Sequence, residues 1–156
     1  MAEKISTGDV QVAAAAIRTA YANGVLAIFG GGTPPATADA AETGTLLCLI
    51  TESGGAFTGG VATNGLNFDA PVGGVLSKAA AETWKGNGLS AAGTGTTATH
   101  FRFYANAYVT GPSTTAVRFD GAISTSSTAE LQMTNPVVVE GYPVEVGTFT
   151  RTVNKA

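Results

Sequence analysis

The sequence contains few charged residues, one histidine and one cysteine. Charged residues make up 12% of the 156 positions, about half the share of an ordinary globular domain. The eight lysines and arginines are spread from Lys4 to Lys155, so no basic patch of the kind that nucleic-acid binding needs is visible. One histidine and one cysteine are too few for an ordinary zinc site, and the acids lack the spacing of a calcium loop. We therefore expect no nucleic-acid partner, no metal and no cofactor.

Long apolar runs and disulfide pairs are also missing. No run approaches the roughly 18 apolar residues of a membrane helix, and the first ten residues, MAEKISTGDV, lack the pattern of a signal peptide. Cys48 has no second cysteine to pair with and lies in the apolar run 45–51. We expect it to be a buried, unreactive thiol. These features predict folding in a reducing cytosol and no membrane partner.

Groups that could perform catalysis are scarce. His100 is expected on the face of its strand opposite Phe101 and Phe103, and a catalytic histidine needs a nucleophile or carboxylate within hydrogen-bond reach. Asp120 and Glu130 are candidates for that neighbour, but nothing in the sequence brings them to His100. The glycine-rich segments 30–32 and 93–97 lack the strand–glycine–helix order of a phosphate site. The sequence therefore predicts no catalytic residue and a chain that is not an enzyme.

One helix is indicated near the start of the chain. Ser6 and Asp9 form the S-x-x-D pattern that caps a first turn, and Asn23-Gly24 supplies a left-handed residue that ends a helix. Between them, apolar residues recur at helical spacing: Val10, Ala13, Ala14, Ile17, Ala20 and Tyr21. This narrow stripe predicts close packing against a sheet or a neighbouring chain. The candidate interface residues are Val10, Ala13, Ile17 and Tyr21 of this helix, together with the single tryptophan, Trp84.

Short strands separated by glycine and proline make up the rest of the pattern. Apolar or alternating runs occupy residues 25–29, 45–51, 72–78, 100–105, 117–120, 131–133, 137–139 and 144–153, as in a sandwich or jelly roll. We also expect a helical turn at 37–43, a loop at 85–88 and a surface loop at 89–97. The predicted fold class is all-β: an antiparallel β-sandwich or jelly roll with one N-terminal α-helix. Residues 1–24 would form an N-terminal arm and helix, and residues 25–156 the β-sandwich domain.

Several segments resemble one family of small proteins. They are residues 24–29 (GVLAIF), Gly31, Pro35, 38–41 (ADAA), 44–47 (GTLL), 84–86 (WKG), 93–103 (GTGTTATHFRF), 119–123 (FDGAI) and 140–146 (EGYPVEV). Together they are similar to proteins encoded by tailed bacteriophages and prophages. The resemblance covers most of the chain and implies a virion structural protein. It carries over no catalytic residues.

Three hypotheses follow from the composition and the resemblance. The first is a capsid decoration or cement protein that stabilises the head shell through protein–protein contacts. It would be made in the host bacterial cytoplasm, found in the virion, self-associated with a trimer as one candidate, and bound to the major capsid protein or another virion protein. The second hypothesis places the protein in the neck, collar, tail or a fibre. The third is a carbohydrate-binding module in which Trp84, with Tyr104 as a further candidate, would stack on a sugar.

Overall fold

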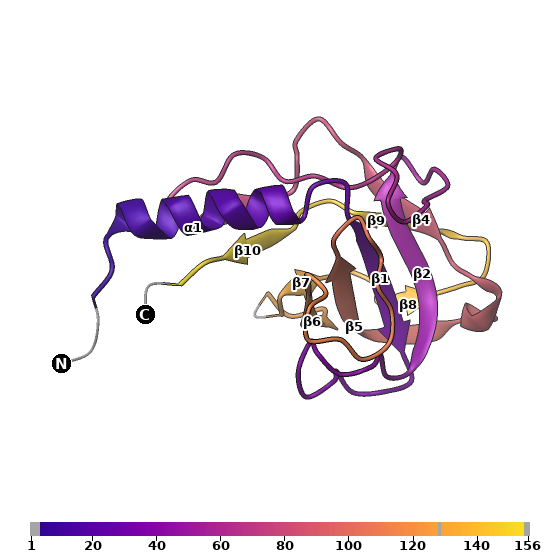
Figure 1. Cartoon of the computed structure of the whole chain (residues 1–156). Coiled ribbons are helices and arrows are strands. Elements are labelled where there is room, and N and C mark those ends of the chain that lie inside the picture. Colours follow the sequence, from indigo (N-terminus) through magenta and orange to yellow (C-terminus); the bar gives the residue numbers. More distant parts are fainter. Residues whose placement is uncertain (1–3, 128, 155–156) are drawn as a thin grey trace.

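The structure is a computed structural model that describes residues 4–127 and 129–154. It contains one α-helix, one short 3-10 helix and a series of short strands (Figure 1). In chain order they are α1 (Thr7–Ala20), β1 (Val25–Gly30), β2 (Thr45–Glu52), β3 (Val75–Ser77), β4 (Trp84–Asn87), η1 (Ser90–Ala92), β5 (Thr96–Tyr104), β6 (Arg118–Ser124), β7 (Leu131–Gln132), β8 (Val137–Val138), β9 (Pro143–Val146) and β10 (Thr150–Thr152). The expectation of a mostly β protein with one N-terminal helix is confirmed.

Helix α1 begins where the sequence predicts it. The Ser6 side chain accepts a hydrogen bond from the Asp9 N–H, and the Asp9 carboxylate accepts one from the Ser6 N–H, each at 3.0 Å. This reciprocal pair satisfies backbone donors of the first turn that have no partner within the helix. After α1 ends, Asn23 takes a left-handed conformation with φ of 56°. The chain then turns directly into β1.

The main sheet differs from the sandwich that the sequence predicts. Its strand order is β7-β6-β5-β1-β2-β4-β9, with β8 paired to the end of β5. The pair β6–β7 is parallel and its other pairs are antiparallel, so the sheet is mixed. It curls strongly into a half-barrel (Figure 1) rather than forming two clear layers. Strand twist accumulates across this path, and register shifts interrupt the pairing of β1 with both of its neighbours.

A smaller sheet and the helix extend from one side of the half-barrel. Strands β3 and β10 form a separate two-stranded sheet, and α1 runs alongside it (Figure 1). The Gln11 side chain joins the helix to the turn before β3, since its Nε2 donates to the Pro71 carbonyl and its Oε1 accepts from the Gly74 N–H. Val10 and Ala14 are buried on the inner face of the helix. The helix is therefore held to the β3–β10 pair by one buried stripe.

Side chains cover the central strands of the half-barrel on both faces. Every residue of β1 is buried. On one face lies the main core, whose aromatic members include Phe68, Trp84, Phe101, Phe103 and Phe149. On the other face a second cluster forms around Val25, Ala27, Phe29 and Tyr104. Burial on both faces explains why the sequence of β1 is a continuous apolar run rather than an alternating one.

Three segments differ from their sequence-based expectations. Residues 37–43 form a turn and bends instead of a helical turn, and residues 85–88 are mostly strand β4 instead of a loop. Residues 89–97, expected to be a surface loop, contain η1, with Ala92 buried, and the start of β5. Gly86 explains the second case. A Cβ there would lie 2.0 Å from the Leu49 carbonyl oxygen, so this glycine permits close packing of β4 and does not mark a turn.

Candidate functional site

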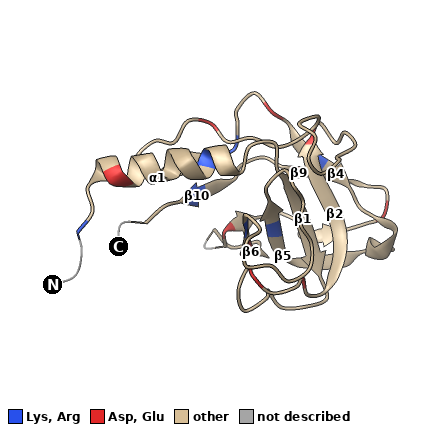
Figure 2. Ribbon diagram, in the orientation of Figure 1, with Lys and Arg blue, Asp and Glu red and all other residues tan. Residues whose placement is uncertain are grey.

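The outward face of α1 carries almost no charge. Val12, with 72% of its surface exposed, and the exposed residue Ala16 lie on the side of the helix away from the buried Val10 and Ala14, and the exposed residues Ala13 and Ala20 lie on the flank beside them. Figure 2 shows one acidic and one basic residue on α1, near its two ends, and these are Asp9 and Arg18. Most of this face therefore presents small uncharged side chains that another protein can approach without desolvating ions.

The candidate interface residues of α1 separate onto two sides of the helix. Val10 and Tyr21 are buried within this chain, and Ile17 packs against the main core. Only Ala13 is exposed. Three of the four therefore attach the helix to its own domain. Of the exposed residues near Ala13, Ala20 belongs to the sequence pattern, whereas Val12 and Ala16 do not. The apolar stripe identified the buried side of the helix.

Trp84 lies in the core and has no exposed surface. Its ring packs against Phe68, Phe103 and Phe149 with centroid distances of 5.6–5.8 Å. Its Nε1 donates a hydrogen bond to Glu82 at 2.8 Å. Trp84 therefore cannot contact a partner from this position, nor can it serve as a platform for a sugar. Tyr104, the other aromatic residue considered for stacking, is also buried.

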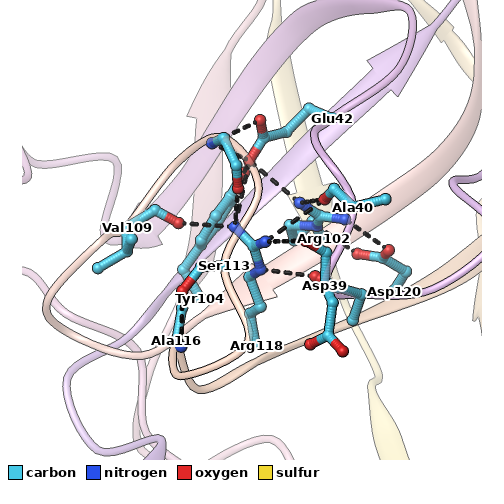
Figure 3. Close-up of polar contacts among 12 residues, drawn as sticks. Asp39, Ala40, Glu42, Arg102, Tyr104, Val109, Ser113, Ala116, Arg118 and Asp120 are labelled. Carbon is cyan, nitrogen blue, oxygen red and sulfur yellow. Dashed lines mark hydrogen bonds and ion pairs between the residues drawn. The ribbon is translucent and has the colours of Figure 1, made fainter.

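The main polar cluster is built around two buried arginines (Figure 3). Arg102 in β5 is 1% exposed and lies opposite Asp120 in the β5–β6 register. Its Nε and Nη2 donate to the two Asp120 oxygens at 2.5 and 2.8 Å. Its Nη1 donates to the Ala40 carbonyl at 2.9 Å and to Glu42 at 3.1 Å. Every nitrogen of the guanidinium is thus paired, which a buried cation requires.

The second arginine, Arg118, binds backbone carbonyls from two loops. It donates to Ala38 and Asp39 in the segment between β1 and β2, and to Val109 and Gly111 in the segment between β5 and β6. Figure 3 shows the Arg118 guanidinium between Val109 and Asp39, whose carbonyl groups accept bonds from it. Arg118 therefore fixes two long loops to each other and to the sheet.

Glu42 completes this arginine cluster. Its carboxylate accepts hydrogen bonds from the Tyr104 hydroxyl at 2.6 Å and from the Gly111 N–H at 2.9 Å. Burial alone would raise the pKa of Glu42, but these bonds and the charge of Arg102 outweigh it and hold the pKa below its ordinary value. The pKa of Tyr104 is raised by burial and by the nearby carboxylate. Both groups keep their usual charge at neutral pH, so the cluster supports a structural role.

The sequence reading missed this cluster for a specific reason. Arg102 and Asp120 both alternate with phenylalanine along their strands, which is usual for residues on a solvent-facing side. That side is instead covered by the loops 31–44 and 105–117, which carry Glu42 and the carbonyls that bind Arg118. The signal that could have indicated coverage is Glu42, which together with Asp39 places two acids in the otherwise uncharged loop 31–44. The partner of Glu42 lies 60 residues away in sequence.

His100 occupies the middle of β5, not its beginning as expected, and lies on the opposite face from Phe101. It is buried, stacks on Phe29 with a centroid distance of 5.3 Å, and its Nδ1 is 3.0 Å from the Thr99 hydroxyl. Burial lowers the pKa of His100, which favours the neutral ring. Asp120 is engaged by Arg102. The site therefore resembles a packed structural histidine, with no carboxylate directed at it in the described chain.

Other candidate chemistry is limited within the part of the chain that the structure describes. Cys48 is buried, and burial raises the pKa of its thiol to about 12. No group of three or more His, Cys, Asp and Glu among residues 4–127 and 129–154 is arranged to hold a metal ion. No helix formed by these residues is long and apolar enough to cross a membrane.

Comparisons with known proteins give no relative for this chain. Neither the sequence models of known families, nor the curated proteins, nor the solved structures contain a match.

Proposed function

We propose that this chain is a structural protein of a bacteriophage virion, and specifically a decoration or cement protein of the head shell. The observation that carries the proposal is the exposed surface of α1, which presents Val12 and Ala16 on its outward face and Ala13 and Ala20 on its flank with little charge. The resemblance to phage proteins drawn from the sequence segments 24–29, 38–41, 44–47 and 93–103 is consistent with the same class. So is the low charge of the chain as a whole, 12% of its residues.

The physical basis of such a role is contact between uncharged surfaces. Small side chains on a helix let another backbone approach closely, and the buried apolar area then contributes about 25 cal/mol per Å², less the cost of association. Repeated binding sites on a shell favour a symmetric oligomer, and we propose self-association, with a trimer as one candidate. The second contact would be the major capsid protein or another virion protein.

The test combines a location measurement with a charge substitution. Cryo-electron microscopy of purified particles is expected to show density for this protein on the shell. Ala16→Glu places a charge on the outward face of α1 without a steric conflict inside the domain, and we expect it to reduce particle binding at least about tenfold. Val61→Glu, at an exposed position elsewhere on the chain, is the matched control and should bind like wild type. Absence of the protein from particles would refute the proposal.

A location in the neck, collar, tail or a fibre keeps the same class of function. Copy number separates it from the shell, since shell proteins are present in hundreds of copies and neck or tail-tip proteins in about a dozen or fewer, as the family resemblance implies. A quantitative gel of purified particles measures this number. We place the protein on the shell because a neutral, small-residue helix face suits repeated lateral contacts.

A further inference from the structure

The half-barrel is open along one side, and a continuous groove follows the opening. One end is a cavity of about 440 Å³ lined by residues of β7 and β9, the other is a cavity of about 490 Å³ lined by β6 and β10, and a smaller one of about 150 Å³ lies between them. Neighbouring cavities share lining residues: Gln132 and Thr148 at the first junction, and Ala129, Glu130, Phe149 and Thr150 at the second. We call this feature the seam groove.

Both walls of the seam groove are strand edges whose backbone groups have no strand partner. At the two ends of the β3–β10 pair, the Phe149 carbonyl accepts a hydrogen bond from the Lys78 N–H and the Val153 N–H donates to the Gly74 carbonyl. The alternation of an antiparallel ladder therefore directs the N–H and C=O groups of Thr150 and Thr152 away from β3. On the β9 side, the Gly88 N–H next to β4 donates to the Tyr142 carbonyl. By the same alternation, the N–H and C=O groups of Glu145 point away from β4, toward the unpaired edge of β9.

The opposite wall has the same property. On β7, Met133 donates to the Ser124 carbonyl of β6, which leaves the backbone groups of Gln132 facing away from β6. In the described chain, β7, β9 and β10 each pair with one strand only. Unpaired strand edges beside a groove are the surface that an extended polypeptide recognises, because each added residue supplies matching donors and acceptors.

Arg151 gives the groove its chemical preference. Its guanidinium lies 4.2 Å from the centroid of Phe119 and 5.0 Å from that of Tyr21, and its Nη1 is buried with no hydrogen-bond partner. None of the ion pairs within 4.0 Å among residues 4–127 and 129–154 involves Arg151. A partly buried guanidinium without an anion is stabilised strongly when a carboxylate is supplied.

None of the acids that line the same groove is within ion-pair distance of Arg151 among the described residues. Asp120 gives both oxygens to Arg102, and Glu130 accepts a hydrogen bond from the Ala122 N–H. Glu145 lines the cavity at the other end. Most other acids of the described chain also accept bonds from their own chain, as the side chains of Asp9, Glu42, Asp69 and Glu82 do. A second copy therefore offers few free carboxylates, which favours a different protein as the source.

We propose that the seam groove binds an extended segment of another virion protein, which adds a strand along the free edges and places an acidic side chain beside Arg151. This inference rests on the proposed function and specifies the partner. Glu145 lines one end of the groove and Arg151 the other, where Asp120 is held by Arg102 and Glu130 accepts from the Ala122 N–H. The acidic side chain of the added strand is therefore matched to the Arg151 end rather than to the Glu145 end.

The test uses a short strand-forming peptide as the probe. It is a fluorescein-labelled peptide of sequence KTVTETVTK, with versions that carry glutamine or lysine in place of the central glutamate, and anisotropy reports binding to the full-length protein. We expect the glutamate version to bind about tenfold more tightly than the glutamine version, and the lysine version more weakly still. Arg151→Gln should abolish this ranking, and Arg151→Lys should retain part of it.

A second variant tests strand addition separately from charge. Thr150→Pro removes an edge N–H that does not bond to β3, so we expect weaker binding of all three peptides while thermal unfolding stays close to wild type. Val72→Ala, at an exposed position outside the groove, should leave binding unchanged. Hydrogen exchange should slow at the amides of Gln132, Glu145, Thr150 and Thr152 when peptide is added.

Three results would overturn the proposal. They are no binding at about 1 mM peptide, equal affinity for the glutamate and glutamine versions, or protection of amides elsewhere. Because the assay needs no particle, its failure rejects the seam groove alone. Absence of the protein from purified particles rejects the proposed function instead.

Discussion

Neutralising Asp120 tests how much the buried arginine cluster contributes to stability. In wild type, Arg102 donates to the two carboxylate oxygens of Asp120 at 2.5 and 2.8 Å. In Asp120→Asn, the amide offers at most one oxygen to accept these bonds, and the negative charge is lost. Arg102, only 1% exposed, would then retain Glu42 and the Ala40 carbonyl as its other partners. Removing one partner of a buried pair costs 3–5 kcal/mol. Because some partners remain, we expect a loss at the lower end, about 3 kcal/mol.

Urea unfolding followed by circular dichroism measures this loss. The same chemical change on the surface, Asp69→Asn, is the matched control, since Asp69 is exposed and accepts one bond from the Ala80 N–H. It should cost about 1 kcal/mol or less. For a chain of this length a loss of about 3 kcal/mol corresponds to a fall in Tm of roughly 10 °C.

Salt provides an independent check on the same variant. A surface pair is screened at 1 M salt, where the Debye length is about 3 Å, and a buried pair is screened much less. The difference between wild type and Asp120→Asn should therefore persist in 1 M NaCl. If Asp120→Asn costs no more than Asp69→Asn, or if salt removes the difference, the cluster does not stabilise the loops in the way described.

Three further predictions concern single buried groups. Burial lowers the pKa of His100 in the folded protein, so as pH falls below about 6.5 the unfolded chain binds a proton at this histidine before the folded chain does. The free energy of unfolding should therefore decrease below about pH 6.5 in wild type, and should decrease less in His100→Gln. An equal pH dependence of the two proteins would contradict this. Cys48, whose pKa is about 12, should react with maleimide at neutral pH only on unfolding; rapid labelling of the native protein would be inconsistent with its burial. Gly86→Ala should cost at least about 2 kcal/mol because a Cβ meets the Leu49 carbonyl oxygen at 2.0 Å, whereas Gly147→Ala, which meets nothing within 4 Å, should be neutral in the same unfolding assay.

Local sequence patterns were sufficient for the helix and several strands. The capping pair Ser6 and Asp9 lies within one turn, so its geometry depends on neighbouring residues alone. The apolar runs of β1 and β2 are long enough to be recognised without knowledge of their partners. What these patterns could not provide is curvature: whether strands form two layers or one curled sheet depends on twist and bulges accumulated across the whole path. The sandwich prediction was wrong at that level.

The arginine cluster lay beyond sequence reasoning because it joins distant segments. Glu42 and Arg102 meet only after β1, β2 and β5 pair in register. Similarly, Trp84 was considered an interface or sugar-stacking residue because it is the single tryptophan, but its neighbours Phe68, Phe103 and Phe149 come from separate parts of the chain. A large aromatic residue is suited to a core as well as to an interface, and only its neighbours distinguish the two.

The three free edges of the seam groove are protected to different degrees, and this difference argues for where a partner strand would attach. Proteins guard exposed edges with short strands, charges and prolines. Strand β7 contains two residues, and β9 has Pro143 and Glu145 at the positions whose backbone faces outward. The outward positions of β10 are instead Thr150 and Thr152, uncharged residues with high strand propensity. Strand β10 is also short, with three residues, but its outward positions carry neither charge nor proline. This edge, next to an arginine without an anion, is therefore expected to make the first contact, with β7 and β9 completing the groove around it.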